Sequence, residues 1–379
     1  MHSEGSSDAR WRALFESRRG VSAQSRTGTL TDGPSDPPAH GPRRPARGRP
    51  RLAVGLLLTA LVLVAASWAS LLFGSEHITV NDVLRAVFDP DLSDRAQLVV
   101  REERIPRTVA GLLTGAALGL AGAVMQGVAR NPLADPGILG VNSGASVAVV
   151  FGIGILGFTS PSQYIWFGFI GALVAAVLVY SVGSLGREGA TPVKLALAGA
   201  ATTAVLTSLT TAILLTDREV FDRFRFWKVG SLSGRDAEVL WQAAPFIAVG
   251  VLFALTLGPQ LNALSLGDDI ARALGQRVGV ARLLSAAAVV LLCGAATTIA
   301  GPIGFVGLVI AHASRMITGP DYRWILPYSA LLAPALILVS DVAGRFIGRP
   351  GEVQVGIVTA VVGAVPFIVL VRRRNLAEL

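Results

Sequence analysis

Charged residues are scarce in this sequence, and their scarcity narrows the class of protein. Only 15% of its 379 residues are Asp, Glu, Lys or Arg, whereas hydrophobic residues make up 52% and the mean hydropathy is +0.59. Soluble domains carry about a quarter charged residues. The composition therefore excludes an ordinary soluble domain and favours a chain that lies mostly in lipid.

Cysteine and histidine are also rare. The single cysteine, Cys293, excludes an intrachain disulfide and a thiolate metal site, and we interpret it as a small packed residue. The four histidines show no spacing that is typical of metal ligands; they are His2, His40, His77 and His312. We therefore expect no metal and no other cofactor bound by this chain.

Lysine occurs only at Lys194, after Val193, and at Lys228, after Trp227. A phosphate-binding loop of the G-x-x-x-x-G-K-[ST] type requires a lysine directly after a glycine. The chain has no such loop, so a separate subunit must hydrolyse nucleotide if hydrolysis drives this protein. We also find no nucleophile or ligand cluster typical of a membrane enzyme.

Long apolar stretches dominate the remaining sequence. A bilayer core about 30 Å thick requires roughly 20 apolar residues in helical form, because unpaired backbone groups are too costly in lipid. The sequence therefore predicts an all-α, multi-pass membrane protein. The ten predicted helices are residues 52–73, 106–128, 137–157, 164–184, 193–215, 238–257, 281–300, 302–317, 324–344 and 353–371.

Basic residues flank the first and the last of these helices. Five arginines between residues 43 and 51 precede the first helix, and residues 372–374 are three arginines that follow the last. Because cytoplasmic loops carry an excess of Lys and Arg, both termini are predicted to be cytoplasmic. One segment disagrees with this rule, because its basic residues then lie outside; they are Arg218, Arg223, Arg225 and Lys228.

Residues 1–50 differ in composition from the rest. They are rich in Arg, Pro, Gly and Ser and lack apolar periodicity, so we predict a disordered cytoplasmic tail before a transmembrane permease domain at 51–374. An alternative is that the arginines of the tail contact anionic lipid headgroups. The net charge of +8 comes mostly from this tail and the C-terminus, and nucleic-acid binding is not needed to explain it.

Glycines recur along the second predicted helix. Small residues at four-residue spacing allow helices in lipid to approach closely. The glycines predicted to pack against other helices are Gly111, Gly115, Gly119 and Gly122.

Several long segments resemble the iron-siderophore and cobalamin permease family of ABC importers. They are RIPRTVAGLLTGAALGLAGAVMQGVARNPLADPGILGVNSGA at 104–145, FWKVGSL at 226–232, LNALSLGDDIARALG at 261–275, AGPIGFVGLVIAHASR at 300–315, SDVAGRF at 340–346 and GEVQVGIVTAVVGAVPF at 351–367. The resemblance covers roughly residues 75 to 374.

This resemblance implies a ten-helix permease subunit in the cytoplasmic membrane that is not itself an enzyme. Its expected partners are a second permease copy or a paralogue, two cytoplasmic ATPases that use ATP and Mg, an extracytoplasmic solute-binding protein and membrane lipid. The expected cargo is a ferric siderophore, with cobalamin or haem as alternatives. A metal-ion ABC permease is a further alternative. An ion-coupled secondary transporter is disfavoured because the helices carry almost no central charge.

The resemblance also assigns roles to residues at the two membrane faces. Outward-facing Arg104, Arg107 and Arg345 would receive acidic residues of the binding protein, since the guanidinium fork binds carboxylates; the alternative is that they anchor helix ends in headgroups. A coupling helix would rest on the ATPase, and the alternative is an amphipathic helix on the lipid surface. The coupling residues are Leu266, Gly267, Asp268, Asp269, Ile270, Ala271, Leu274 and Gly275.

By the same resemblance, the fifth helix would line the path of the cargo. An inner gate is expected at Thr191, Pro192 and Val193, and the hydroxyls of Thr203 and Thr207 are expected along the path. The alternative for each hydroxyl is a hydrogen bond to a carbonyl of its own helix.

Overall fold

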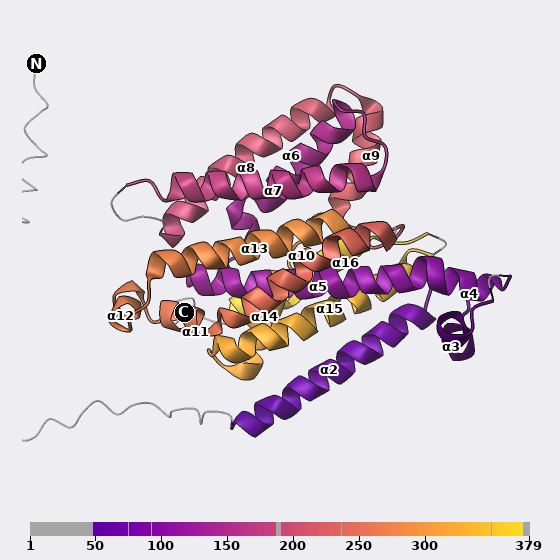
Figure 1. Ribbon diagram of the computed structural model, residues 1–379, viewed down its shortest axis with the longest axis horizontal. Coiled ribbons are helices and arrows are strands. Elements are labelled where there is room, and N and C mark those ends of the chain that lie inside the picture. The colour runs from indigo at the N-terminus through magenta and orange to yellow at the C-terminus, as the bar shows by residue number, and fades with distance from the viewer. Residues whose placement is uncertain are drawn as a thin grey trace, which may run out of the picture. The chain divides into compact units, whose positions relative to one another are not determined.

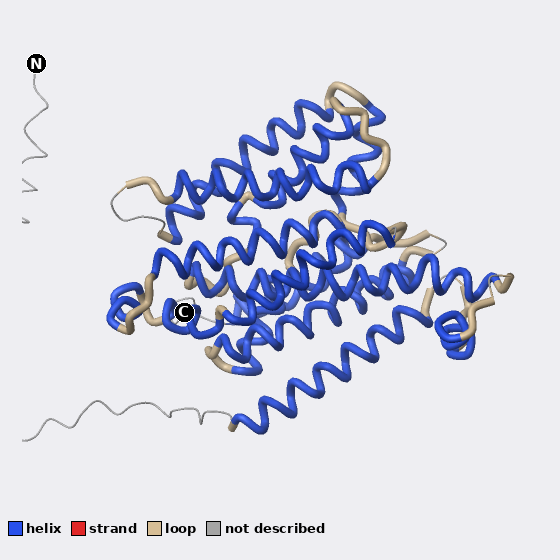
Figure 2. Tube along the Cα trace, viewed as in Figure 1, coloured by secondary structure: helices blue, strands red, loops and turns tan. Residues whose placement is uncertain are grey.

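The computed structural model describes residues 48–373, except 75, 92, 187–190, 236 and 350. The described residues from 48 to 373 belong to one compact unit. The predicted disordered tail lies outside the described residues, apart from residues 48–50. Every regular element in the described part of the chain is a helix (Figure 2).

Each of the ten predicted segments contains a helix (Figure 1). These helices are α2 (Arg49–Leu72), α5 (Ile105–Ala129), α6 (Val141–Gly154), α7 (Pro161–Gly183), α8 (Pro192–Leu214), α10 (Ala237–Thr256), α13 (Val278–Ala300), α14 (Val306–Thr318), α15 (Tyr322–Ile347) and α16 (Val355–Arg373). Among the described residues, seven stretches are long and apolar enough to cross a membrane, whereas Val141–Gly154, Val306–Thr318 and Val355–Val365 are shorter. The chain is therefore a multi-pass membrane protein.

Two of the predicted segments differ from the structure in a way that the backbone conformation explains, and the boundaries of the other eight agree within three residues. Gly140 has a φ of +71°, which divides the predicted helix 137–157 into a short 3-10 helix, η2 (Pro136–Leu139), and α6. Gly301 and Phe305 also have positive φ, so α14 begins at Val306 and not at residue 302. Such left-handed conformations end regular helices.

Several short helices lie between the long ones. They are α3 (Val80–Phe88), α4 (Arg95–Val99), the π-helix η1 (Val100–Arg104), α9 (Arg218–Val229), α11 (Gly258–Ser265) and α12 (Asp268–Ala273). Of these, α12 falls on the predicted coupling segment. The sequence analysis did not predict α3 or α9, because neither helix is long enough to give a membrane-spanning hydropathy signal.

A capping box begins α3. The Thr79 hydroxyl and the Thr79 backbone N–H both donate to the Asp82 carboxylate, at 2.7 and 2.8 Å, and Asp82 N–H donates back to Thr79 Oγ1. The two hydrogen bonds from Thr79 hold the pKa of Asp82 below its usual value. This reciprocal pattern is a common helix start.

The central helix of the bundle is α5. It packs against α15, α13, α14 and α10, while α6, α7 and α8 form a second group that joins the first through contacts between α7 and α13 (Figure 1). The α5 segment is 78% buried, whereas α2 is only 17% buried and packs chiefly on α15. Most of α5 is therefore unavailable to lipid or to partner proteins.

Small residues allow α5 to approach its neighbours closely. A Cβ atom at Gly115 would collide with the backbone of Pro334 in α15, and one at Gly119 would collide with the carbonyl of Ser329. Gly122 meets Gly307 of α14 backbone to backbone, and Gly111 lies against the Leu338 side chain. The helix α2 is less buried than α5, and its buried residues form only a narrow stripe; they are Leu52, Thr59, Ala66 and Ser70.

Hydrogen bonds from α15 fix both ends of α2. Near the start of α2, the Tyr328 hydroxyl donates to the Leu52 carbonyl at 2.8 Å. Near its end, Arg345 Nη1 donates to the carbonyls of Ser70 and Phe73 at 2.8 and 2.7 Å. These carbonyls lie at the helix terminus, where intrahelical partners are missing.

Candidate functional site

The ion pairs that connect the helices of the bundle lie at its two ends. We call the end where α2 and α15 terminate the Arg107 end, and the end that carries α12 the α12 end (Figure 1). Each end holds one of the two sets of residues that the sequence analysis selected for contact with partner proteins.

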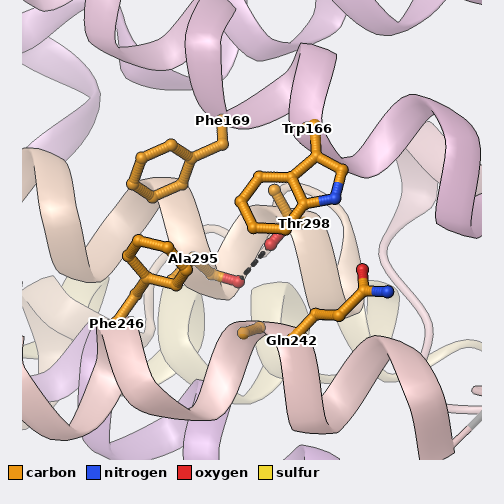
Figure 3. Close-up of a pocket in the computed structure, with 7 residues that line it drawn as sticks. Trp166, Phe169, Gln242, Phe246, Ala295 and Thr298 are labelled. Carbon is orange, nitrogen blue, oxygen red and sulfur yellow. Dashed lines mark hydrogen bonds between the residues drawn. The ribbon is translucent and has the colours of Figure 1, made fainter.

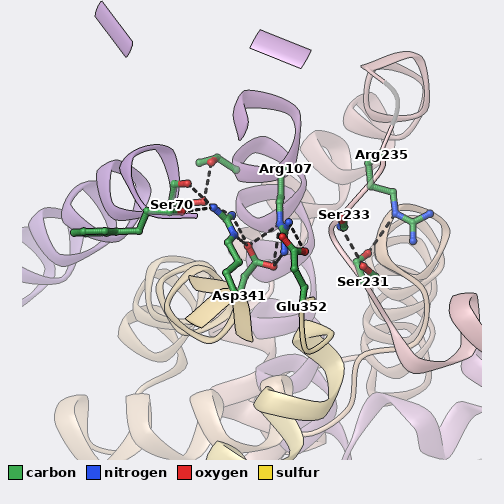
Figure 4. A network of polar contacts seen from close by, with 10 residues as sticks. Ser70, Arg107, Ser231, Ser233, Arg235, Asp341 and Glu352 are labelled. Atoms are coloured by element: carbon green, nitrogen blue, oxygen red, sulfur yellow. Dashed lines mark hydrogen bonds and ion pairs between the residues drawn. The ribbon is translucent and has the colours of Figure 1, made fainter. Parts of the chain in front are cut away.

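A buried carboxylate organises the Arg107 end (Figure 4). Asp341 is 1% exposed and accepts hydrogen bonds from Arg107 Nε and Nη2 at 2.9 and 2.8 Å and from Arg345 Nη2 at 2.5 Å. Arg107 Nη1 also donates to Glu352 at 2.8 Å. We call these residues, with Ser70, the Asp341 network; together the two arginines and two carboxylates balance in charge.

Arg104 lies beside this network but has no carboxylate partner among the hydrogen bonds it makes. Its guanidinium donates to the carbonyls of Leu71 and Glu76 at 2.7 and 2.6 Å. The sequence analysis expected Arg104 and Arg345 to face outward, whereas in the structure each is only 4% exposed. Both side chains turn inward because the unpaired carbonyls at the end of α2 and the Asp341 carboxylate attract them.

Arg107 is the most accessible of the three arginines. Its side chain is 12% exposed, and its partner Glu352 is 35% exposed. The guanidinium is therefore shared between one buried and one partly exposed carboxylate. Such an arrangement allows the outer carboxylate to be exchanged while the inner ion pair stays in place.

At the α12 end, Asp268 connects three helices. Its carboxylate accepts from Arg282 of α13 at 2.9 Å and forms an ion pair with Arg130 at the end of α5. Asp268 is the first residue of α12, where the helix dipole also favours negative charge. The sequence analysis selected Asp268 but gave no signal for these partners, which are 14 and 138 residues away.

Apolar side chains of the predicted coupling segment are exposed on the surface of the protein. Leu266, Ile270 and Leu274 are 55%, 51% and 65% exposed, whereas Ala271 is fully buried. Gly267 and Gly275 have φ of +105° and +81° and bound the helix, a conformation that glycine adopts without strain. Asp269 is exposed and pairs with Arg272 at 2.9 Å.

The residues expected at the gate and along the path lie on α8. Thr191 is the N-cap of α8 and accepts from Lys194 N–H at 3.4 Å, and Val193 is 69% exposed. Thr203 is half-buried and Thr207 is exposed. Three other hydroxyls of α8 donate to carbonyls of their own helix; they belong to Ser208, Thr210 and Thr211.

An aromatic cluster packs between α7, α10 and α13 (Figure 3). Phe246 packs against Trp166 and Phe169 with ring centroids 5.7 and 5.3 Å apart. The cavity among these rings is about 10 Å³, which is room for one water molecule. This cavity is too small to hold a metal chelate.

Among the described residues, no group of three or more His, Cys, Asp and Glu side chains is placed to hold a metal ion. Cys293 is buried in α13 and has no disulfide partner. The polar chemistry of this part of the chain is thus that of ion pairs and hydrogen bonds.

The chain is similar to known transport proteins over most of its length. The FecCD transport family model matches residues 61–373. The ferric enterobactin transport system permease protein FepD of Escherichia coli (strain K12) is 46% identical over 321 residues, which cover 85% of this chain and 95% of that protein. The Fe(3+)-citrate import system permease protein YfmD of Bacillus subtilis (strain 168) is 39% identical over 321 residues, which cover 84% and 95%.

A solved structure has the same arrangement of helices. It is described as an inward-facing conformation of a metal-chelate type ABC transporter, and it matches with a TM-score of 0.74 and 29% identity. The match covers 86% of this chain and 99% of that one. The region matched by the family model contains every long helix except the first part of α2, which begins before residue 61.

Proposed function

Because the chain belongs to the FecCD transport family, we propose that it is the permease subunit of an ABC importer that carries an iron chelate across the cytoplasmic membrane. The observation that carries this proposal is the 46% identity to a ferric enterobactin permease over 85% of the chain. The subunit is not an enzyme, and a partner protein hydrolyses ATP. A ferric siderophore is the proposed cargo, with cobalamin or haem as the second candidates.

We propose that the permease domain spans residues 51–374 with ten crossings and that both termini are cytoplasmic. The Arg107 end then faces the outside, and the α12 end faces the cytoplasm. Two copies of the subunit, or one copy and a paralogue, form the path, with α8 lining it and a gate at residues 191–193. Residues 1–50 form a cytoplasmic tail. ATP and Mg are used only by the partner ATPase.

Reconstitution tests this function directly. Proteoliposomes that hold the permease, its ATPase and its binding protein should accumulate iron-55 chelate when ATP is supplied inside. Vesicles that hold the permease alone should accumulate none under a proton or sodium gradient. Accumulation driven by the ion gradient would contradict the proposal and would indicate a secondary transporter.

Coupling to the ATPase is proposed to run through α12. The exposed Leu266, Ile270 and Leu274 would contact the ATPase, and the buried side of α12 is fixed to α5 and α13 by Asp268. A displacement of α12 would therefore reach the two most buried membrane helices, since charge-assisted hydrogen bonds connect them.

Asp268→Asn should uncouple hydrolysis from transport. The substitution keeps the shape of the side chain but removes the charge that holds Arg130 and Arg282, so iron transported per ATP should fall roughly tenfold. Asp269→Asn removes only an exposed ion pair and should have a clearly smaller effect. Both ratios can be measured in proteoliposomes. Equal effects of the two substitutions would contradict the assignment.

Docking of the binding protein is proposed at the Arg107 end. An acidic side chain of the binding protein would replace Glu352 on the outer edge of the Arg107 guanidinium, while Asp341 keeps the inner edge. Arg104 and Arg345 would support this contact through their positive charge and by fixing α2, since both are buried.

Competition between carboxylates gives this docking proposal a distinctive test. Glu352→Gln should strengthen binding of the loaded binding protein about threefold, because it removes the competing charge, and Arg107→Gln should weaken it about tenfold. Arg95→Gln breaks an exposed ion pair with Glu76 at the same end and is the matched control. Binding can be measured on permease–ATPase complexes in nanodiscs. Weaker binding by Glu352→Gln would refute the exchange.

A further inference from the structure

The basic residues of α9 form a continuous face that the proposed function does not yet explain. Arg218, Arg225 and Lys228 are spaced by seven and three residues, which places them on one side of a helix. All three are exposed. We call them the basic face of α9. The residues of the buried face are Val220, Phe224 and Trp227.

The helix α9 runs alongside α6. Gly154 at the end of α6 lies against Val220, and Ser146 in the middle of α6 accepts a hydrogen bond from Lys228 at 3.0 Å. Val220 and Lys228 are eight residues apart on α9, and their partners Gly154 and Ser146 are eight residues apart on α6. The two helices are therefore antiparallel, and eight residues of helix span about 12 Å. Lys228 therefore lies about 12 Å below the end of α6 at which Arg218 is found.

Lys228 keeps an unbalanced charge at this depth. Within the described residues it forms no ion pair, and its amine donates to the hydroxyl of Ser146. Ser146 is 2% exposed and donates in turn to the carbonyl of Asn142 at 2.7 Å. A cation without an ion-pair partner is stable only where water or an anion reaches it, and the Lys228 side chain is exposed among the described residues.

The other two basic residues add positive charge to this face. Arg225 pairs with Asp222 at 3.3 Å, but both side chains are more than half exposed, so the interaction is weak. The excess of basic residues here also opposes the usual distribution of Lys and Arg in membrane proteins.

We propose that the basic face of α9 guides an anionic cargo into the bundle and that Lys228 contacts it there. The substrate class is thus an iron chelate with net negative charge, such as one whose ligands are catecholate or carboxylate oxygens. A neutral hydroxamate chelate would gain nothing from these residues. The inference rests on the proposed function, because it assumes that cargo passes beside α6, α8 and α9, which pack together.

Uptake of two iron-55 probes that differ in net charge tests the inference. One is a ferric tris-catecholate, which is trianionic, and the other is a neutral ferric tris-hydroxamate; both are given to cells whose only chelate importer contains this subunit. Lys228→Met should lower tris-catecholate uptake roughly tenfold, because the cation that meets the anion is lost. Lys228→Arg restores the charge and should stay within about twofold of the unmodified protein.

Two controls separate the charge from other effects. Arg223→Met removes one charge from α9 away from the basic face, where Arg223 pairs with Glu219, and should change uptake less than about twofold. Ser146→Ala removes the hydrogen bond but keeps the cation, so it should also have a small effect. If Ser146→Ala reproduces the loss in Lys228→Met, or if Lys228→Met depletes the subunit from the membrane, Lys228 is structural and the inference is overturned.

The probes also separate this inference from the function on which it rests. Uptake of the neutral tris-hydroxamate alone would refute an anionic substrate class and leave the chelate importer standing. Failure of both probes to raise ATP-dependent iron uptake above that of cells without the importer would refute the proposed function itself.

Discussion

Replacement of Asp341 by alanine should destabilise the protein by about 3–5 kcal/mol, because two buried guanidiniums would lose their shared carboxylate. Arg345 is 4% exposed and Arg107 has a side chain that is 12% exposed, so water cannot replace the lost partner. The two arginines would then also repel each other. Thermal unfolding in nanodiscs, followed by loss of helical signal, measures this effect.

Glu76→Ala is the control for this prediction. Glu76 pairs with Arg95 at the same end of the bundle, but the Arg95 side chain is 84% exposed, so the expected cost is below about 1 kcal/mol. Asp341→Asn should fall between the two, since the amide keeps hydrogen-bond acceptors but not the charge. If the alanine variant at position 341 melts no lower than the one at position 76, the network does not hold this end together.

Replacement of Gly115 by alanine should force α5 and α15 apart. A single methyl group there would overlap the backbone of Pro334, which cannot move as a flexible side chain can. Overpacking of this kind costs about 1–3 kcal/mol. The measured quantity is the unfolding temperature of the purified subunit, together with the amount of it that accumulates in the membrane.

Gly279→Ala provides a matched substitution in another membrane helix. Apart from its chain neighbours and its own helix backbone, no atom lies within 4 Å of the position that its Cβ would occupy, so only helix propensity changes, which favours alanine by up to about 1 kcal/mol. The two substitutions should therefore shift the unfolding temperature in opposite directions. A gain in stability at both positions would show that α5 and α15 do not rely on their close approach.

The helices that cross the membrane could be predicted because lipid imposes a strong length and composition requirement. Each predicted segment contains a helix, and the errors occur where single residues leave the helical conformation, as at Gly140 and Phe305. The short helix α9 could not be predicted by hydropathy, since half of its twelve residues are charged. Its buried face becomes recognisable only when α6 is beside it.

The polar partners were beyond prediction for a different reason. Asp341 and Arg107 are separated by 234 residues, and nothing in either local sequence identifies the other. The family resemblance selected Arg107 and Arg345 as contacts for a partner protein. It could not reveal that Arg345 donates to carbonyls at the end of α2. Inward or outward orientation depends on which acceptors the fold brings near, and that is set by tertiary structure.

The attachment of α2 has a consequence for the order in which the chain is assembled. Its polar anchors on α15 are Tyr328 and Arg345, and Tyr328 is synthesised 276 residues after the Leu52 carbonyl that it binds. While translation continues, α2 has to persist in the bilayer without α15, on which it chiefly packs. Its mean hydropathy of 2.3 makes it stable in lipid during that time. If the ribosome stalled before α15, α2 would be inserted but not packed against α15, and membrane quality control would have access to it.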